Sequence, residues 1–213
     1  MTIASKVDFS AANPGNTGWP LFSEPQPSPP NFPVGVSLPK ISIVTPSFNQ
    51  AQYLEETIRS VLLQGYPNLE YIIIDGGSTD GSVEIIKKYE PWLTYWVSEP
   101  DSGQSHAINK GFRKSTGEIM AWINSDDYYE GDAFSTIAET FIMTTNTLWV
   151  AGKCEFIDID GQKSNGWGKP IEQIERWFVG PVVMQPGVFW RRALWNCTQG
   201  AEPAHGIHSK DRD

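Results

Sequence analysis

Apolar and polar residues alternate in blocks between residues 40 and 143. Four short apolar runs, rich in β-branched and aromatic residues, favour strands covered on both faces; they span residues 41–45, 71–75, 92–97 and 119–123. Each run is followed by apolar residues at helical spacing, most clearly at Phe134, Ile137, Ala138, Phe141 and Ile142. The alternation of strand and helix predicts an α/β fold, a Rossmann-like three-layer sandwich with a mainly parallel sheet.

The regions that flank these blocks lack this periodic pattern of apolar residues. Residues 1–39 carry eight prolines and show neither the alternation of a strand nor the spacing of a helix, which predicts an extended or disordered leader. The pattern weakens after residue 149, where we expect a hairpin at 156–161, a short helix at 171–178 and a strand at 188–190. Residues 197–213 have no period and predict a divergent or disordered tail, so the expected folded domain is 40–196.

Three local signals predict where single elements begin or end. Pro46 should end the strand, because proline cannot donate to a ladder. Asn49 should cap the helix that follows, with Gln52 at the capping-box offset. Asp80 should cap the next helix in the same way.

The charge excludes one large class of partners. The formal net charge is −9 and no cluster of Lys and Arg occurs, which argues against nucleic acid as the main partner. No run approaches the roughly 18 apolar residues of a transmembrane helix, and the N-terminus lacks a signal pattern. We therefore expect a cytoplasmic protein without a transmembrane segment, with peripheral association at the inner face of the membrane left open. The two cysteines fit a reducing compartment and ordinary packing.

Three predicted strands end in loops that carry hydroxyl, amide and carboxylate side chains. The loops span residues 45–49, 75–80 and 124–127, and a predicted helix begins near residue 103. The carboxyl ends of parallel strands lie at one edge of a sheet, where such folds bind ligands, and a helix N-terminus can receive an anion. A ligand site at this edge is therefore expected.

The last of these loops contains two adjacent acids, Asp126 and Asp127. They would repel each other and any anionic ligand, so a divalent cation is one reason to place them there, and capping of the next helix is the other. No G-x-G-x-x-G follows the first strand, and neither G-x-x-x-x-G-K-[ST] nor G-x-S-x-G occurs. This disfavours dinucleotide oxidoreductases, P-loop NTPases and acyl transferases, and leaves a metal-assisted site for a phosphorylated ligand.

The chain carries, in order, the motifs Ile43-Val44-Thr45-Pro46-Ser47-Phe48-Asn49, Asp75-Gly76-Gly77-Ser78-Thr79-Asp80-Gly81, Gly103-Gln104-Ser105, Ala107-Ile108-Asn109-Lys110-Gly111 and Asn124-Ser125-Asp126-Asp127. With these motifs, residues 40–196 resemble the family 2 glycosyltransferases of the GT-A fold. The resemblance implies a nucleotide-diphospho-sugar donor, a divalent metal (Mn²⁺ or Mg²⁺), and transfer to a saccharide or lipid-linked acceptor, normally with inversion.

The same resemblance assigns residues to roles. Asp126 and Asp127 would be the acids of the metal site. The expected donor-binding residues are Thr45, Pro46, Phe48, Asn49, Asp75, Gly76, Ser78, Gln104, Ser105, Asn124 and Asp126.

Several positions depart from the family pattern. Gly76 and Asn124 stand where many relatives carry acids, and His106 stands where the closest pattern has Asp. Residues 185–192 match the acceptor-side segment, but residues 201–213 do not resemble the continuation that supplies a catalytic base, so the acceptor half is expected to be short or truncated. The alternative function is therefore a truncated or inactive sugar-nucleotide-binding remnant. A nucleotidyltransferase fits less well, since no Gly-rich basic loop follows the first strand.

Overall fold

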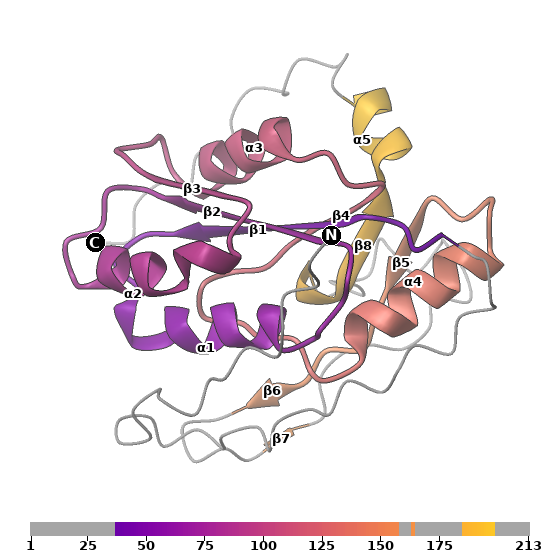
Figure 1. Cartoon of the computed structure of the whole chain (residues 1–213), viewed down its shortest axis with the longest axis horizontal. Coiled ribbons are helices and arrows are strands. Elements are labelled where there is room, and N and C mark those ends of the chain that lie inside the picture. Colours follow the sequence, from indigo (N-terminus) through magenta and orange to yellow (C-terminus); the bar gives the residue numbers. More distant parts are fainter. Residues whose placement is uncertain (1–36, 158–162, 165–184, 199–213) are drawn as a thin grey trace.

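A computed structural model describes residues 37–157, 163–164 and 185–198. At its centre is a six-stranded sheet in the order β3-β2-β1-β4-β8-β5 (Figure 1). The strands are β1 (Ile41–Ser47), β2 (Leu69–Asp75), β3 (Tyr95–Ser98), β4 (Ile119–Trp122), β5 (Trp149–Ala151) and β8 (Val188–Arg191). The first four are parallel, and β8 runs antiparallel to both β4 and β5. The predicted α/β fold with a mainly parallel sheet is confirmed.

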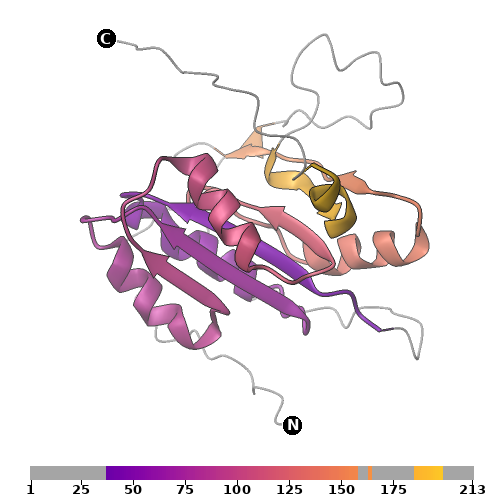
Figure 2. The same cartoon turned by 90° about the horizontal axis from the view of Figure 1, so that it is seen from above.

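Helices cover both faces of this sheet. They are α1 (Ala51–Leu62), α2 (Ser82–Tyr89), α3 (Gln104–Lys114), α4 (Ala133–Met143) and α5 (Arg192–Thr198), with short 3-10 turns η1 (Glu90–Trp92) and η3 (Gln185–Gly187). Helices α1, α2 and α4 lie on one face, and α3 and α5 on the other (Figures 1 and 2). The predicted three layers are therefore present. None of the helices in the described part of the chain is long and apolar enough to cross a membrane.

Each face of the sheet has its own hydrophobic core. The larger core joins inward residues of β1 and β2 to α1, α2 and α4, and it contains Ile43, Tyr71, Leu54 and Phe134, all at most 1% exposed. Four of the five residues of the predicted stripe on α4 belong to it. The smaller core joins Val44, Ile72, Ile74 and Met120 to Ala107 and Phe112 of α3. Both faces of the central strands are buried, which is why their sequence reads as unbroken apolar runs.

Helix α3 approaches β1 closely at Gly111. A Cβ atom at this position would lie 2.4 Å from Cγ1 of Val44, a fully buried side chain of β1. Ordinary van der Waals contacts are 3.4–4 Å. The helix therefore rests on the strand by its backbone, and it can do so only because residue 111 has no side chain.

Glu70 connects β1, β2 and the segment before β4 at the amino ends of the parallel strands. Its carboxylate accepts hydrogen bonds from Ser42 Oγ (2.5 Å), Thr116 N (2.6 Å) and Thr116 Oγ1 (2.8 Å), and Glu70 is 5% exposed. Arg192 at the start of α5 donates to Gly117 O (2.6 Å). Burial tends to raise the pKa of Glu70, but the hydrogen bonds from Ser42 and Thr116 outweigh it and the pKa is lowered.

Two predictions about strand boundaries need correction. Pro46 does not end β1, which continues to Ser47. The reason is geometric: Val44 O accepts from Ile123 on the β4 side and Ser47 O from Gly76 on the β2 side, so Pro46 faces β4 beyond the last β1–β4 pair. The strand expected at 92–97 begins only at Tyr95, because residues 90–92 form η1.

The weakly patterned end of the chain is described in part. The predicted strand at 188–190 is present as β8, and the predicted hairpin corresponds to antiparallel pairing of β6 (Phe156–Ile157) with β7 (Lys163–Ser164). The expected helix at 171–178, nearly all of the leader and most of the tail lie outside the described residues.

Candidate functional site

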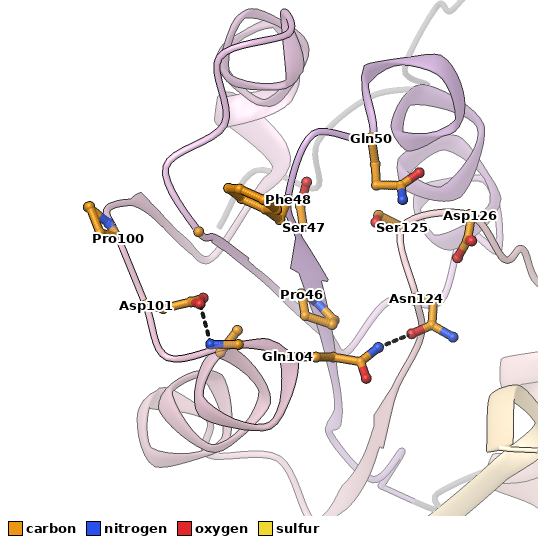
Figure 3. A pocket seen from close by; sticks show the side chains of 13 residues that line it. Pro46, Ser47, Phe48, Gln50, Pro100, Asp101, Gln104, Asn124, Ser125 and Asp126 are labelled. Atoms are coloured by element: carbon orange, nitrogen blue, oxygen red, sulfur yellow. Dashed lines mark hydrogen bonds between the residues drawn. The ribbon is translucent and has the colours of Figure 1, made fainter. Parts of the chain in front are cut away.

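A cavity of about 790 Å³ opens at the carboxyl ends of β1 and β4, beside the start of α3 (Figure 3). Its lining residues are Pro46, Ser47, Phe48, Gln50, Gly76, Pro100, Asp101, Gly103, Gln104, Ala107, Asn124, Ser125 and Asp126. The cavity therefore lies where the sequence predicted a ligand site, between loops that follow different strands.

The structure divides the predicted donor-binding residues into two groups. Those that line the cavity are Pro46, Phe48, Gly76, Gln104, Asn124 and Asp126. Those that do not are Thr45, Asn49, Asp75, Ser78 and Ser105, and the second predicted metal ligand, Asp127, is also outside the lining. Lining residues that the sequence did not single out as ligands include Gln50, Pro100 and Asp101.

Asp75 lies at the end of β2 and is fully buried. It accepts hydrogen bonds from Gly77 N (3.1 Å), Ser78 N (2.9 Å), Ser78 Oγ (2.5 Å) and Ser98 Oγ (2.6 Å). These bonds fold the glycine-containing loop back over the strand end. Asp75 thus fixes the conformation of the loop that contributes Gly76 to the cavity. That Asp75 approaches a nucleoside stays a prediction.

Asn49 joins the first two loops and does not cap α1, contrary to expectation. It adopts a left-handed backbone conformation (φ 51°), its N–H donates to Ser78 Oγ (2.8 Å), and its Oδ1 accepts from Thr79 N (3.0 Å). The first N–H of α1, on Ala51, donates instead to Asp80 Oδ2 (2.8 Å). Asp80 Oδ1 also accepts from Ser82 N (3.1 Å) at the start of α2, so one carboxylate serves the beginnings of two helices.

Thr45 does not line the cavity, although the next residue, Pro46, does. It is fully buried, and its hydroxyl is 3.1 Å from the hydroxyl of Tyr71. Burial raises the pKa of Tyr71, so its hydroxyl stays protonated over the physiological range. This pair links the neighbouring strands β1 and β2.

The other side of the cavity is formed by a chain of amide and carboxylate groups. Gln104 Nε2 donates to Asn124 Oδ1 (2.6 Å), and Asn124 Nδ2 donates to Asp127 Oδ2 (2.8 Å). Burial raises the pKa of the Asp127 carboxyl; the hydrogen bond from Asn124 opposes this, and the neighbouring Asp126 adds to it. Asp126 is exposed on the cavity wall, so the two adjacent acids have different surroundings.

The charge of the cavity lining is one-sided. Among the described residues, the lining contains the carboxylates of Asp101 and Asp126 and no Lys, Arg or His. Among the described residues no group of three or more His, Cys, Asp or Glu could hold a metal ion. One or two carboxylates are nevertheless the protein ligands that Mg²⁺ commonly uses when substrate phosphates and water complete its shell. The residues present therefore fit a metal that binds together with a phosphorylated ligand.

The start of α3 faces the same cavity. Gly103 has a positive φ of 101°, and its N–H donates to Asp101 Oδ1 (2.7 Å). His106 Nδ1 accepts from Ser102 N (3.4 Å), which turns the ring toward its own loop. Residue 106 does not line the cavity.

Comparison with known proteins identifies the family. Residues 42–179 match the family model of glycosyl transferase family 2. The chain belongs to glycosyl transferase family 2. An uncharacterised glycosyltransferase of Mycobacterium tuberculosis is 40% identical over 128 residues, 58% of this chain and 49% of the relative. The putative teichuronic acid biosynthesis glycosyltransferase TuaG of Bacillus subtilis is 38% identical over 97 residues, 44% of this chain and 38% of the relative.

A solved structure supports the fold assignment of this family 2 chain. The mannosyltransferase PcManGT from Pyrobaculum calidifontis, in complex with GDP-Man and Mn²⁺, superposes with a TM-score of 0.58 at 22% identity. The similarity covers 81% of this chain and 51% of that structure, and it confirms the predicted GT-A-type fold. The chain spans about half the length of the first relatives it matches.

Proposed function

We propose that this family 2 domain binds a nucleotide-diphospho-sugar with a divalent metal and transfers the sugar, with inversion, to a saccharide or lipid-linked acceptor. The observation that carries the proposal is the cavity at the strand ends, whose lining, as far as the described residues form it, offers carboxylates and amides but no positive side chain. A diphosphate carries several negative charges. A cation bound at Asp126 would offset the repulsion between this carboxylate and the diphosphate.

Asp126 is the residue we assign to the metal, because it is exposed on the cavity wall. Asp127 lies outside the cavity lining, and its Oδ2 accepts a hydrogen bond from Asn124. We assign Asp127 a supporting role that includes electrostatic attraction of the cation. A Mn²⁺ or Mg²⁺ ion held there supplies stabilisation of the negative charge that develops on a leaving nucleoside diphosphate.

The nucleoside end of the donor has a place near Phe48. This ring is 61% exposed although it belongs to the cavity lining, to which Pro46 of β1 also contributes (Figure 3). A planar base that stacks on an exposed aromatic side chain gains about 1–3 kcal/mol. Covering the ring with a base therefore accounts for an aromatic side chain that is otherwise left in water.

Isothermal titration calorimetry tests the proposal directly. UDP-, GDP- and dTDP-sugars are titrated into the protein with Mn²⁺, with Mg²⁺ and with EDTA. We expect binding of at least one donor that depends on metal and is lost in Asp126→Ala and weakened in Asp127→Ala. Glu84→Ala, an exposed acid on α2 outside the cavity, is the control and should bind like wild type. The proposal fails if no donor shows metal-dependent binding and both aspartate variants behave like wild type.

The nature of the acceptor is the finer part of the proposal. The name of TuaG, a teichuronic acid biosynthesis glycosyltransferase, favours a saccharide acceptor. Transfer to a lipid-linked saccharide would take place at the cytoplasmic face of the membrane. Radiolabelled donor supplied with free oligosaccharides or with extracted lipid-linked acceptors separates the two cases by the solubility of the labelled product.

A second candidate function is a sugar-nucleotide-binding module without transferase activity. The observation in its favour is that the described cavity lining holds just two carboxylates, Asp101 and Asp126, and neither is identified as a base for an acceptor hydroxyl. Product formation with a donor and acceptor panel supports the transferase. Slow hydrolysis of bound donor without any transfer supports the binding module.

A further inference from the structure

One carboxylate oxygen of Asp101 accepts a hydrogen bond from its own loop, and the other faces the cavity. Oδ1 accepts the N–H of Gly103 at 2.7 Å, which shapes the turn before α3. Within the described part of the chain no hydrogen bond to Oδ2 is recorded. Figure 3 shows the side chain pointing from the loop between β3 and α3 into the cavity. The turn alone explains one oxygen and leaves the other available to a ligand.

Gly76 brings this free oxygen close to the exposed aromatic ring. A Cβ atom at residue 76 would lie 3.2 Å from Cδ2 of Phe48 and 3.3 Å from Oδ2 of Asp101. The ring edge and the carboxylate oxygen therefore approach the same point above the Gly76 backbone. A side chain at residue 76 would crowd both, so the glycine preserves the arrangement.

An aromatic ring next to a charged acceptor is suited to a planar group that carries an N–H on its edge. The ring offers a stacking surface, and an ionised carboxylate can only accept hydrogen bonds. Uracil, thymine and guanine present a ring N–H on their pairing edge. Cytosine and adenine present an unprotonated ring nitrogen there, whose lone pair the carboxylate would repel, so only their exocyclic amino group could donate to Asp101.

We propose that Asp101 selects the nucleobase of the donor by accepting its ring N–H, so that the site prefers uridine, thymidine and guanosine nucleotides over cytidine and adenosine nucleotides. This inference rests on the proposed function, since it concerns the donor at the same site. A hydrogen bond to a charged group changes a dissociation constant by about tenfold or more. That is the size of preference we expect.

Asp101→Asn is the decisive variant. Asparagine keeps the size of the side chain, and its Oδ1 can still accept from Gly103 N, so the turn before α3 is retained. The amide NH₂ then occupies the place of Oδ2 and donates where the carboxylate accepted. Glu84→Gln makes the same change in net charge at an exposed position outside the cavity and serves as the matched control.

The experiment measures dissociation constants for UDP, dTDP, GDP, CDP and ADP with Mn²⁺ by calorimetry. We expect wild type and Glu84→Gln to bind the first three about tenfold or more tightly than the last two. In Asp101→Asn the first three should weaken by a similar factor, and CDP should not weaken, because the amide can donate to the ring nitrogen of cytosine.

Other outcomes overturn the inference in distinguishable ways. If wild type binds several of the five diphosphates with metal but without this ranking, the proposed function stands and the role of Asp101 is wrong. The same conclusion follows if Asp101→Asn keeps the wild-type ranking or weakens all five equally. If wild type binds none of the five, the proposed function and the inference fail together.

Discussion

Gly111→Ala is the substitution whose effect the structure specifies most closely. The new Cβ would lie 2.4 Å from Cγ1 and 3.0 Å from Cγ2 of Val44. Val44 belongs to a central strand, is fully buried and is β-branched, so it has little freedom to rotate away. To reach an ordinary contact of 3.4 Å, α3 and β1 must separate by about 1 Å at this point.

Two opposing effects set the size of the loss. An extra methyl in a well-packed core reduces the free energy of unfolding by about 1–3 kcal/mol. Replacing a helical glycine by alanine increases it by about 1 kcal/mol at most. The first effect is the larger because the clash is with a strand at the centre of the sheet. We expect a net destabilisation of about 1–2 kcal/mol.

Urea unfolding followed by tryptophan fluorescence measures this change, and a double-mutant cycle identifies its cause. Val44→Ala alone leaves a gap, whereas Val44→Ala with Gly111→Ala places the new methyl in that gap. We expect the two substitutions to be coupled by about 1 kcal/mol or more, in the direction that the double variant is more stable than additivity predicts. Nucleotide binding should follow the same order, because α3 begins at Gln104 in the cavity wall.

A contrary result is easy to recognise. If Gly111→Ala alone raises the free energy of unfolding by about 1 kcal/mol, helix propensity is the whole effect and the close approach of α3 to β1 is wrong. Strictly additive effects of the two substitutions would refute the contact with Val44 itself.

Two further substitutions test the hydrogen bonds that hold the frame around the site. Glu70→Gln should lower the free energy of unfolding by about 1.5–3 kcal/mol at pH 7 in urea titrations, because the buried carboxylate accepts three short hydrogen bonds. The pKa of Glu70 is lowered in the folded state, so the ionised carboxylate contributes fully to the free energy of unfolding above the unfolded pKa near 4.3 and loses this contribution as the pH falls through the folded pKa. The difference in stability between Glu70→Gln and wild type should therefore shrink below about pH 4. A difference that stays the same there would contradict the assignment. Asp80→Ala should lower the free energy of unfolding by about 1 kcal/mol, because α1 loses its cap, whereas Asp80→Asn should retain most of the stability. Equal losses of stability in both variants would show that the charge of Asp80 matters, rather than its hydrogen bond to Ala51.

The sequence was sufficient for the order of elements and for the place of the site. Apolar runs in β1, β2 and β4 predicted buried parallel strands, and parallel strands bring their carboxyl ends to one edge. The polar loops after these strands therefore had to meet, and Phe48, Gly76 and Asn124 do line one cavity. These predictions rest on periodicity and topology, which depend on many residues at once.

Predictions about single side chains were less successful, because each depends on the direction of a few bonds. Asn49 was expected to cap α1, yet its left-handed backbone directs its oxygen to Thr79, and Asp80 reaches Ala51 from the neighbouring loop. None of the sequence motifs includes Asp101. An Asp two residues before a glycine at a helix start was a usable signal for the turn, but only the structure shows that its second oxygen faces Phe48 across Gly76.

The junction between β5 and β8 has an evolutionary consequence. Gly152 N donates to Gly187 O (2.8 Å), so the segment that leaves the sheet after β5 returns to it beside its point of departure. Arg191 then anchors the returning strand through hydrogen bonds to Thr147 O (2.9 Å) and Phe141 O (2.7 Å). Doubling the length of a loop with fixed ends costs only about 0.6 kcal/mol. A relative in which the chain between Gly152 and Gly187 has a different length can therefore keep this junction, and with it the sheet that carries the cavity, unchanged.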